Sequence, residues 1–153
     1  INCNGQIALL DGAALDLEQF WQKIFAAQQN IFHACSEDID LIYHYADQKP
    51  LNNVFDTQVA MAFLGHGLQV SYQNALKTCL NIDIDKDQTR SDWLARPLSQ
   101  EQINYAANDV LYLTRLAETL KNDLQSKGLY QYVLDDCQNL FDCFVVFLLT
   151  SNI

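Results

Sequence analysis

The chain has 153 residues, the length of one ordinary domain, and 50% of them are hydrophobic, which allows a single buried core and excludes a disordered chain. Nine Lys and Arg stand against nineteen Asp and Glu, a formal net charge of −10. This sign excludes a protein that holds nucleic acid by bulk attraction to phosphate, unless its carboxylates first bind divalent cations that present positive charge to the phosphate oxygens.

The first half of the chain alternates short apolar runs with amphipathic stretches. We expect strands at 7–10, 30–34 and 54–55, and helices at 16–28, 36–45 and 57–64. Ser36 is placed to cap the second of these helices, and Asp56 to cap the third. The alternation predicts an α/β protein in which a small sheet is flanked by packed helices.

The second half is predominantly helical. A helix is expected at 72–80, before a polar, irregular segment. Pro97 prevents a helix before it, and Ser99 with Gln102 three residues later forms a capping box. The sequence therefore predicts one long helix from this box to about Ser126.

The last part of the chain is apolar and differs from the rest. We expect residues 1–138 to form the domain and treat residues 139–153 as a tail. The apolar run in this tail is too short to cross a bilayer. Two interpretations remain open, a buried strand or helix end and a sequence altered by truncation.

Cysteine content and the absence of long apolar runs bear on where in the cell the protein is located. The five cysteines are odd in number and form no Cys-x-x-Cys pair, so neither a disulfide framework nor a zinc site is indicated. No run of eighteen apolar residues occurs, and the chain does not open with the pattern of a secretory signal. We expect a soluble, cytoplasmic protein with no membrane partner.

Two residues of the expected long helix form a candidate catalytic pair. Tyr105 and Asp109 are four residues apart, so they share one helix face with Cβ atoms about 5 to 6 Å apart. A metal-bound water fits between a phenol and a carboxylate at this spacing. The same pair is common in helices as a tyrosine beside a solvated carboxylate, and the spacing alone leaves both interpretations open.

Three segments carry a family resemblance. The residues WLARPLSQEQINYAANDVLYL, from Trp93 to Leu113, resemble the third exonuclease motif of the ribonuclease D-like enzymes, the Tyr-containing subclass of the DEDD exonucleases. HACSED at 33–38 resembles the second motif, and FDTQ at 55–58 resembles the segment that follows it. The resemblance covers residues 5–138.

This resemblance implies a fold, an activity and a metal site. The fold would be the ribonuclease H-like exonuclease fold, a small mixed sheet flanked by helices. Asp38 and Asp109 would be two of four acidic ligands for two divalent cations, Mg²⁺ or Mn²⁺, and Tyr105 would orient the attacking water. The partner would be the 3′ end of RNA, with tRNA precursors as candidate substrates, and no organic cofactor is implied.

Nearby polar residues have structural interpretations as well. Asp38 follows a strand, where α/β folds gather ligands, but it is also an ordinary residue for a helix start. We expect Asp56 to be structural, as the cap of its helix, and His33 to be a hydrogen-bonded histidine of the core. His44 and His66 have no suitably spaced partners for a zinc site.

The polar segment before Pro97 is a candidate RNA contact. Its Lys86, Arg90, Trp93 and Arg96 could contact the backbone or stack on a base of a single-stranded 3′ end. A solvated loop with Trp93 in the core fits equally well. Both interpretations remain open.

The chain departs from the family pattern at the first motif. No Asp-x-Glu stands on an opening strand, and Asp16-Leu17-Glu18 lies at a helix start. We therefore expect the opening strand and two metal ligands to be missing, the chain by itself to be nearly inactive, and the longer parent protein to hydrolyse RNA from its 3′ end. A DNA-directed proofreading exonuclease and a non-catalytic scaffold of the same fold are the alternatives.

Overall fold

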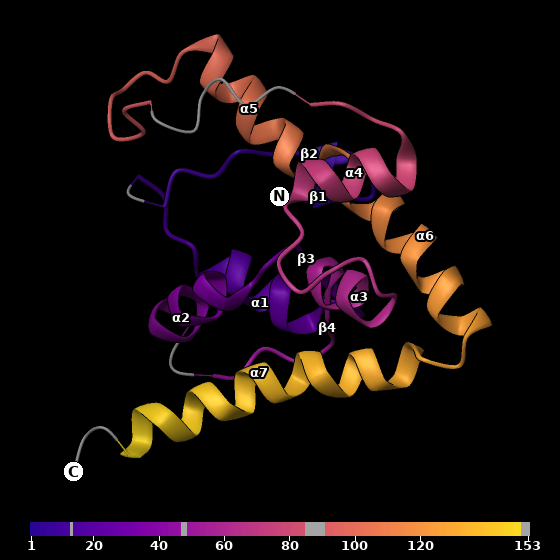
Figure 1. Ribbon diagram of the computed structural model, residues 1–153. Helices are drawn as coiled ribbons and strands as arrows, with labels where there is room; N and C mark the ends of the chain where they lie inside the picture. The colour runs from indigo at the N-terminus through magenta and orange to yellow at the C-terminus, as the bar shows by residue number, and fades with distance from the viewer. Residues whose placement is uncertain (13, 47–48, 85–90, 151–153) are drawn as a thin grey trace.

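The computed structural model describes residues 1–12, 14–46, 49–84 and 91–150, with side chains as far as residue 140. Strands and helices alternate in the first part and helices follow one another in the second, as Figure 1 shows. The elements are β1 (Asn2–Cys3), β2 (Gln6–Ile7), α1 (Glu18–Ala26), β3 (Asn30–Phe32), α2 (Ser36–Tyr45), β4 (Val54–Asp56), α3 (Thr57–Phe63), α4 (Tyr72–Leu80), α5 (Gln100–Leu111), α6 (Leu113–Ser126) and α7 (Tyr130–Thr150). The predicted α/β class is confirmed.

The strands of the described part form two separate pairs. β1 and β2 make an antiparallel hairpin around Asn4 and Gly5, which both have positive φ, as a tight two-residue turn requires. β3 and β4 run parallel, with Phe32 opposite Asp56. The strand expected at 7–10 is wrong beyond Ile7, because its partner β1 is only two residues long.

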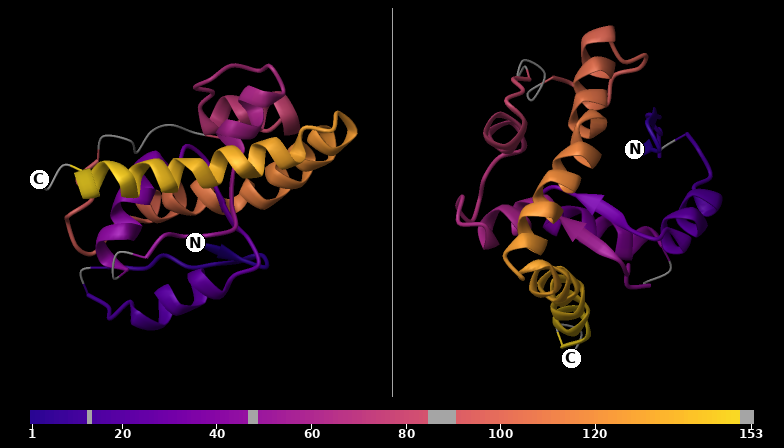
Figure 2. Two further views of the ribbon diagram at one scale, coloured as in Figure 1. Left: turned by 90° about the horizontal axis from the view of Figure 1, so that it is seen from below. Right: turned by 90° about the vertical axis from the view of Figure 1, so that its right-hand side faces the viewer.

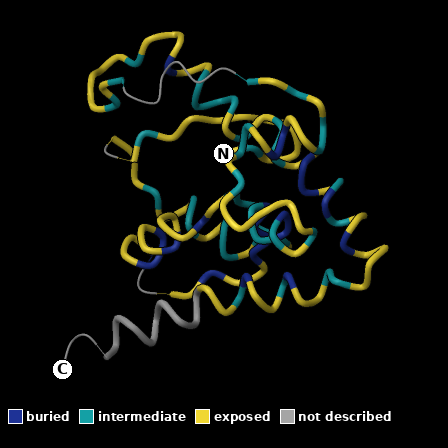
Figure 3. Tube along the Cα trace, in the orientation of Figure 1, coloured by how far each residue is buried: buried dark blue, intermediate teal, exposed yellow. Residues whose placement is uncertain are grey.

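α6 is the central helix of the core. It packs against α3, α4 and β3, while α7 turns back beneath β4 and α3 (Figure 1 and Figure 2). Leu116, Leu120 and Leu124 recur every four residues along α6, so they share one face, and all three are fully buried. In Figure 3, buried stretches recur along α6 between less buried ones.

The long helix predicted from Ser99 to Ser126 is wrong in one respect, since it is two helices. At Tyr112 a turn residue with φ −101° and ψ 0° interrupts the regular helix. On one side of this break, the amide of Asn2 in the hairpin donates to the carbonyl of Val110 in α5 at 3.1 Å. On the other side, α6 packs against α3 and α4, so the break lets each half follow its own surface.

Helix caps follow the sequence at two of three predicted positions. Asp56 caps α3, and Ser99 forms a complete capping box with Gln102. Ser36 is not a cap, because α2 has Cys35 at its N-cap and no side-chain hydrogen bond there. The backbone amide of Cys35 instead donates to the carboxylate of Asp56, the last residue of β4.

The C-terminal tail is helical in its described part. α7 continues through residue 150, so the described part of the tail belongs to this helix, and the division into a domain and a tail stays a prediction. Within the part of the chain that the structure describes, no helix has both the length and the apolar composition needed to cross a membrane.

Candidate active site

A strained turn between β3 and α2 precedes the helix that carries Asp38. After Phe32 the chain passes through Ala34 with φ +61°, a left-handed conformation that costs a residue with a Cβ about 1 to 2 kcal/mol. The carboxylate of Asp56 accepts hydrogen bonds from the amides of Ala34 at 3.1 Å and Cys35 at 2.7 Å. The turn is thereby fixed, and Asp38 lies in the first turn of α2.

Asp38 is a carboxylate in a negative environment. Its side chain is exposed, yet neighbouring chain removes part of its hydration. This desolvation, followed by the charges of Asp56 and Glu37, raises the pKa of Asp38 above its ordinary value. A cation bound here would offset the repulsion, so the chemistry fits a metal ligand.

The second half of the site lies on α5. Tyr105 and Asp109 are one helical turn apart on the same face, as predicted from their spacing. Asp109 is exposed, and desolvation raises its pKa. The ring of Trp93 packs against the ring of Tyr105, with centroids 5.9 Å apart and planes tilted by 51°. An aromatic surface therefore lies beside the phenol.

Gln102 fixes the loop that carries Trp93. Its buried side chain accepts from the Ser99 amide at 2.9 Å and donates to the Asp92 carbonyl at 2.9 Å and the Ser91 hydroxyl at 3.2 Å. One residue thus joins the start of α5 to the loop before it. The sequence showed Gln102 only as a capping partner, because the loop contacts depend on how the chain folds back.

Tyr72 lies near both β3 and Asp109, and no pattern in the sequence indicated this position. Its ring lies 5.5 Å from the ring of His33, at the end of β3. Its phenol oxygen is buried and has no hydrogen-bond partner of ordinary geometry among the described residues. Burial raises the pKa of Tyr72 and the charge of Asp109 adds to the rise, while the nearby backbone of Tyr112 opposes it. Tyr72 therefore lies between β3 and the helix that carries Asp109.

Among the three basic candidate RNA contacts, the structure describes only Arg96. The guanidinium of Arg96 donates to the carboxylate of Asp11 at 2.6 Å and to the carbonyls of Trp93 and Ala95, both at 2.9 Å. Arg96 thus braces its own loop, and its role as an RNA contact remains a prediction. Lys86 and Arg90 lie outside the described residues.

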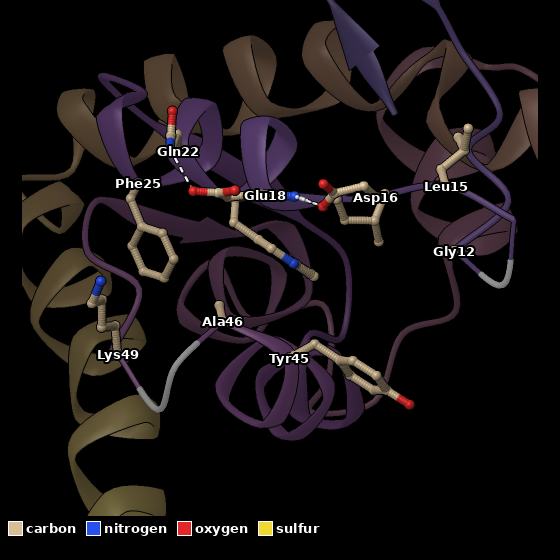
Figure 4. Close-up of a pocket in the computed structure, with 11 residues that line it drawn as sticks. Gly12, Leu15, Asp16, Glu18, Gln22, Phe25, Tyr45, Ala46 and Lys49 are labelled. Atoms are coloured by element: carbon tan, nitrogen blue, oxygen red, sulfur yellow. Dashed lines mark hydrogen bonds between the residues drawn. The ribbon is translucent and has the colours of Figure 1, made fainter.

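A separate cleft of about 650 Å³ lies between α1 and the C-terminal end of α2. In Figure 4, Phe25 and Lys49 lie on one side of this cleft and Tyr45 on the other, while Glu18 donates its amide to Asp16. Neither the Tyr105 pair nor Asp38 lines it. The candidate chemistry therefore lies elsewhere, on the surface around β3 and α5.

Two carboxylates of the described residues are candidate metal ligands. Asp38 and Asp109 are exposed carboxylates, which are suitable oxygen ligands for Mg²⁺ or Mn²⁺. Across the ranges that the structure describes, His, Cys, Asp and Glu side chains nowhere form a group of three or more that could hold a metal ion. The two carboxylates fit a divalent cation chemically, but a complete site needs further ligands.

Comparison with known proteins identifies relatives of the chain. Residues 5–125 match the family model described as 3′-5′ exonuclease. The chain is 41% identical over 142 residues to ribonuclease D of Psychromonas ingrahamii. The matched region covers 92% of this chain and 38% of that protein. The chain therefore spans well under half the length of this relative.

Solved structures agree with the family match. RNase D of Escherichia coli gives a TM-score of 0.72 at 28% identity and covers 79% of this chain and 33% of that one. Brucella melitensis NrnC gives a TM-score of 0.70 both with bound Mg²⁺, at 26% identity, and bound to pGG, at 27% identity, and each match covers 84% of this chain and 63% of NrnC. Because the family model matches most of its length, the chain belongs to the 3′-5′ exonuclease family.

Proposed function

We propose that this chain forms most of the catalytic domain of a 3′-5′ exoribonuclease that hydrolyses RNA one nucleotide at a time by two-metal-ion chemistry. One observation carries the proposal: Tyr105 and Asp109 share a face of α5, beside the ring of Trp93. The strained turn that places Asp38 after β3 supports it.

Each residue has a role in this mechanism. Asp38 and Asp109 are metal ligands, and their raised pKa values reflect surroundings that disfavour an unpaired negative charge. The phenol of Tyr105 forms a hydrogen bond that orients the attacking water. When bound, the two cations would supply an activated water and stabilise the departing 3′ oxygen.

The isolated chain should be nearly inactive. Two divalent cations bring four positive charges, and two carboxylates neutralise only half of them. The sequence has no Asp-x-Glu on an opening strand, the motif that supplies the other two carboxylates in the resembling family. We propose that the longer parent protein supplies them.

The proposed substrate is the 3′ end of RNA, including tRNA precursors. Similarity to ribonuclease D and to NrnC bound to pGG supports an RNA substrate. Trp93 offers a ring on which a terminal base can stack, and Lys86, Arg90 and Arg96 are the proposed backbone contacts. The described cysteines, Cys3, Cys35, Cys79 and Cys137, are free thiols, in keeping with the proposed cytoplasmic location.

Nuclease assays on the parent protein test the proposal. With Mg²⁺ and a 5′-labelled RNA oligonucleotide, we expect a ladder of products shortened from the 3′ end. Tyr105→Phe should slow hydrolysis by about 100-fold or more, because the water loses its orienting hydroxyl. Asp109→Asn should slow it at least as much. Tyr132→Phe is the matched control, since Tyr132 is 62% exposed on α7, and should retain parental turnover.

Different outcomes would favour the alternatives. Equal hydrolysis of DNA and RNA oligonucleotides would favour a proofreading exonuclease, because an RNA-specific enzyme reads the 2′-hydroxyl. A folded parent without Mg²⁺-dependent hydrolysis would favour a scaffold. A processive ladder from the 153-residue chain alone would overturn the proposed inactivity of the fragment.

A further inference from the structure

Asp56 makes more hydrogen bonds than a helix cap requires. Its side chain is 2% exposed, and it accepts from two pairs of backbone amides. The first pair, Gln58 at 2.7 Å and Val59 at 3.4 Å, belongs to the first turn of α3 and accounts for capping. The second pair, Ala34 at 3.1 Å and Cys35 at 2.7 Å, lies across the strand pair and needs another explanation.

The second pair of hydrogen bonds controls the geometry of the turn before α2. Ala34 is held in the left-handed region at φ +61°, a conformation that persists only where surrounding contacts fix it. Cys35, the next residue, is the N-cap of α2. Asp38 follows three residues later in the first helical turn, so a shift of the turn amides moves its carboxylate.

The base of this arrangement is buried and joined to α7. The backbone amide of Asp56 donates to Cys137 Sγ at 3.3 Å, which ties β4 to α7. Cys137 and Val133 on α7 are fully buried, and Phe55, the preceding residue of β4, is fully buried as well. The carboxylate of Asp56 is therefore presented to the turn from a fixed position in the core.

We propose that Asp56 is a positioning residue for Asp38: its buried carboxylate holds the Ala34–Cys35 turn so that the Asp38 carboxylate points into the proposed metal site. The proposal rests on the proposed function, which makes Asp38 a metal ligand. The role of Asp56 goes beyond the proposed function, because Asp56 affects metal binding without touching the metal.

Two substitutions separate this role from helix capping. In Asp56→Asn, the remaining oxygen can keep the Oδ1 bonds to Ala34, Gln58 and Val59, but an NH₂ group then faces the Cys35 amide, donor against donor. In Asp56→Ser, the short hydroxyl still caps α3 but cannot reach the turn. Both variants keep a cap and disturb the turn.

Mn²⁺ binding and amide exchange in the parent protein are the measurements. Calorimetric titration with Mn²⁺ should show an affinity about 10- to 100-fold weaker in both variants, the size of effect seen when a residue that orients a metal ligand is changed. In the metal-free protein, hydrogen–deuterium exchange of peptides that contain Ala34 and Cys35 should be at least about tenfold faster, because the Cys35 amide loses its acceptor.

Thr57→Val is the matched control. Thr57 is the next residue and is fully buried, and its hydroxyl donates to the Phe32 carbonyl at 2.9 Å and lies 2.8 Å from Nδ1 of His33. The variant therefore loses two part-buried polar contacts at the same junction. It leaves the Asp56 carboxylate in place. We expect a lower melting temperature but Mn²⁺ affinity within about twofold of the parent.

The outcomes distinguish the inference from the proposed function. If Asp38→Asn weakens Mn²⁺ binding while Asp56→Asn and Asp56→Ser do not, Asp56 is only a cap and the inference is wrong. If Thr57→Val weakens binding as much as they do, the effect is one of general stability and the inference is equally wrong. If the parent binds Mn²⁺ no more tightly than Asp38→Asn does, the proposed function itself fails.

Discussion

His33 lies just after β3 with both ring nitrogens close to hydrogen-bond partners. Nδ1 is 2.8 Å from the hydroxyl of Thr57, and Nε2 is 2.9 Å from the carbonyl of Val70. This confirms the prediction of a hydrogen-bonded histidine, although the side chain is half-buried. The ring joins β3 to the segment before α4, so it contributes to the same junction that carries Asp38.

The environment of His33 predicts a pH dependence of stability. Burial lowers the pKa of His33 below its ordinary value of 6.5, although the Val70 carbonyl and the charge of Asp56 oppose the shift. At a pH somewhat below 6.5, the imidazole of His33 therefore binds a proton in the unfolded chain but not in the folded protein. The free energy of unfolding should fall as the pH drops from about 6.5 towards the lower pKa of the folded state.

Urea denaturation between about pH 7 and pH 5 checks this prediction. In His33→Asn the proton linkage is absent, so we expect a shallower loss of stability on the acid side than in the parent. His66→Asn, at an exposed position in the loop after α3, serves as the control. Equal slopes for the parent and His33→Asn would contradict the prediction.

At the scale of one element, the start of α5 shows how a local cap becomes a tertiary anchor. Ser99 and Gln102 satisfy each other's backbone amides within the capping box. Gln102 also binds the loop at Asp92, which in turn places Trp93 beside Tyr105. The position of the candidate phenol and of its aromatic neighbour therefore depends on one buried amide.

Gln102→Ala should lower the free energy of unfolding by about 1 to 3 kcal/mol, since the variant removes the part-buried hydrogen bonds of Gln102 to Ser99, Ser91 and Asp92. It should also change the fluorescence of Trp93, measured in a Trp21→Phe background because the chain has two tryptophans. Gln100→Ala, whose side chain binds Asn104 at the exposed surface, should change stability by less than about 0.5 kcal/mol. A Gln102 variant as stable as this control would contradict the prediction.

At the scale of the whole molecule, α6 holds the domain together. It contacts β3 and the helices α3, α4, α5 and α7 (Figure 2). Its buried leucines meet Met61 of α3 and Leu76 of α4 in one hydrophobic core. Loss of packing on this face should therefore destabilise the domain as a unit.

Leu120→Ala should lower the free energy of unfolding by about 2 to 5 kcal/mol, because the side chain is fully buried and a cavity remains. Leu94→Ala makes the same chemical change at a side chain that is 90% exposed, and should cost less than about 0.5 kcal/mol. Thermal or urea unfolding of the two variants measures the difference. Similar losses in both would show that α6 is not the centre of the core.

The sequence by itself determined features that depend on neighbouring residues. The helix at 72–80, the cap at Asp56 and the capping box at Ser99 were predicted correctly, because each rests on hydrogen bonds and periodicity within a few residues. The match around Tyr105 and Asp109 likewise indicated the exonuclease family, since these residues lie in one continuous motif.

Only the tertiary structure decided contacts between distant parts of the chain. Arg96 pairs with Asp11, 85 residues away, and Asp56 binds the turn at Cys35, 21 residues away. The helix break at Tyr112 has the same origin, because α5 and α6 pack on different surfaces. Such contacts form because whole elements bury apolar surface together, a sum over many residues that no short stretch of sequence contains.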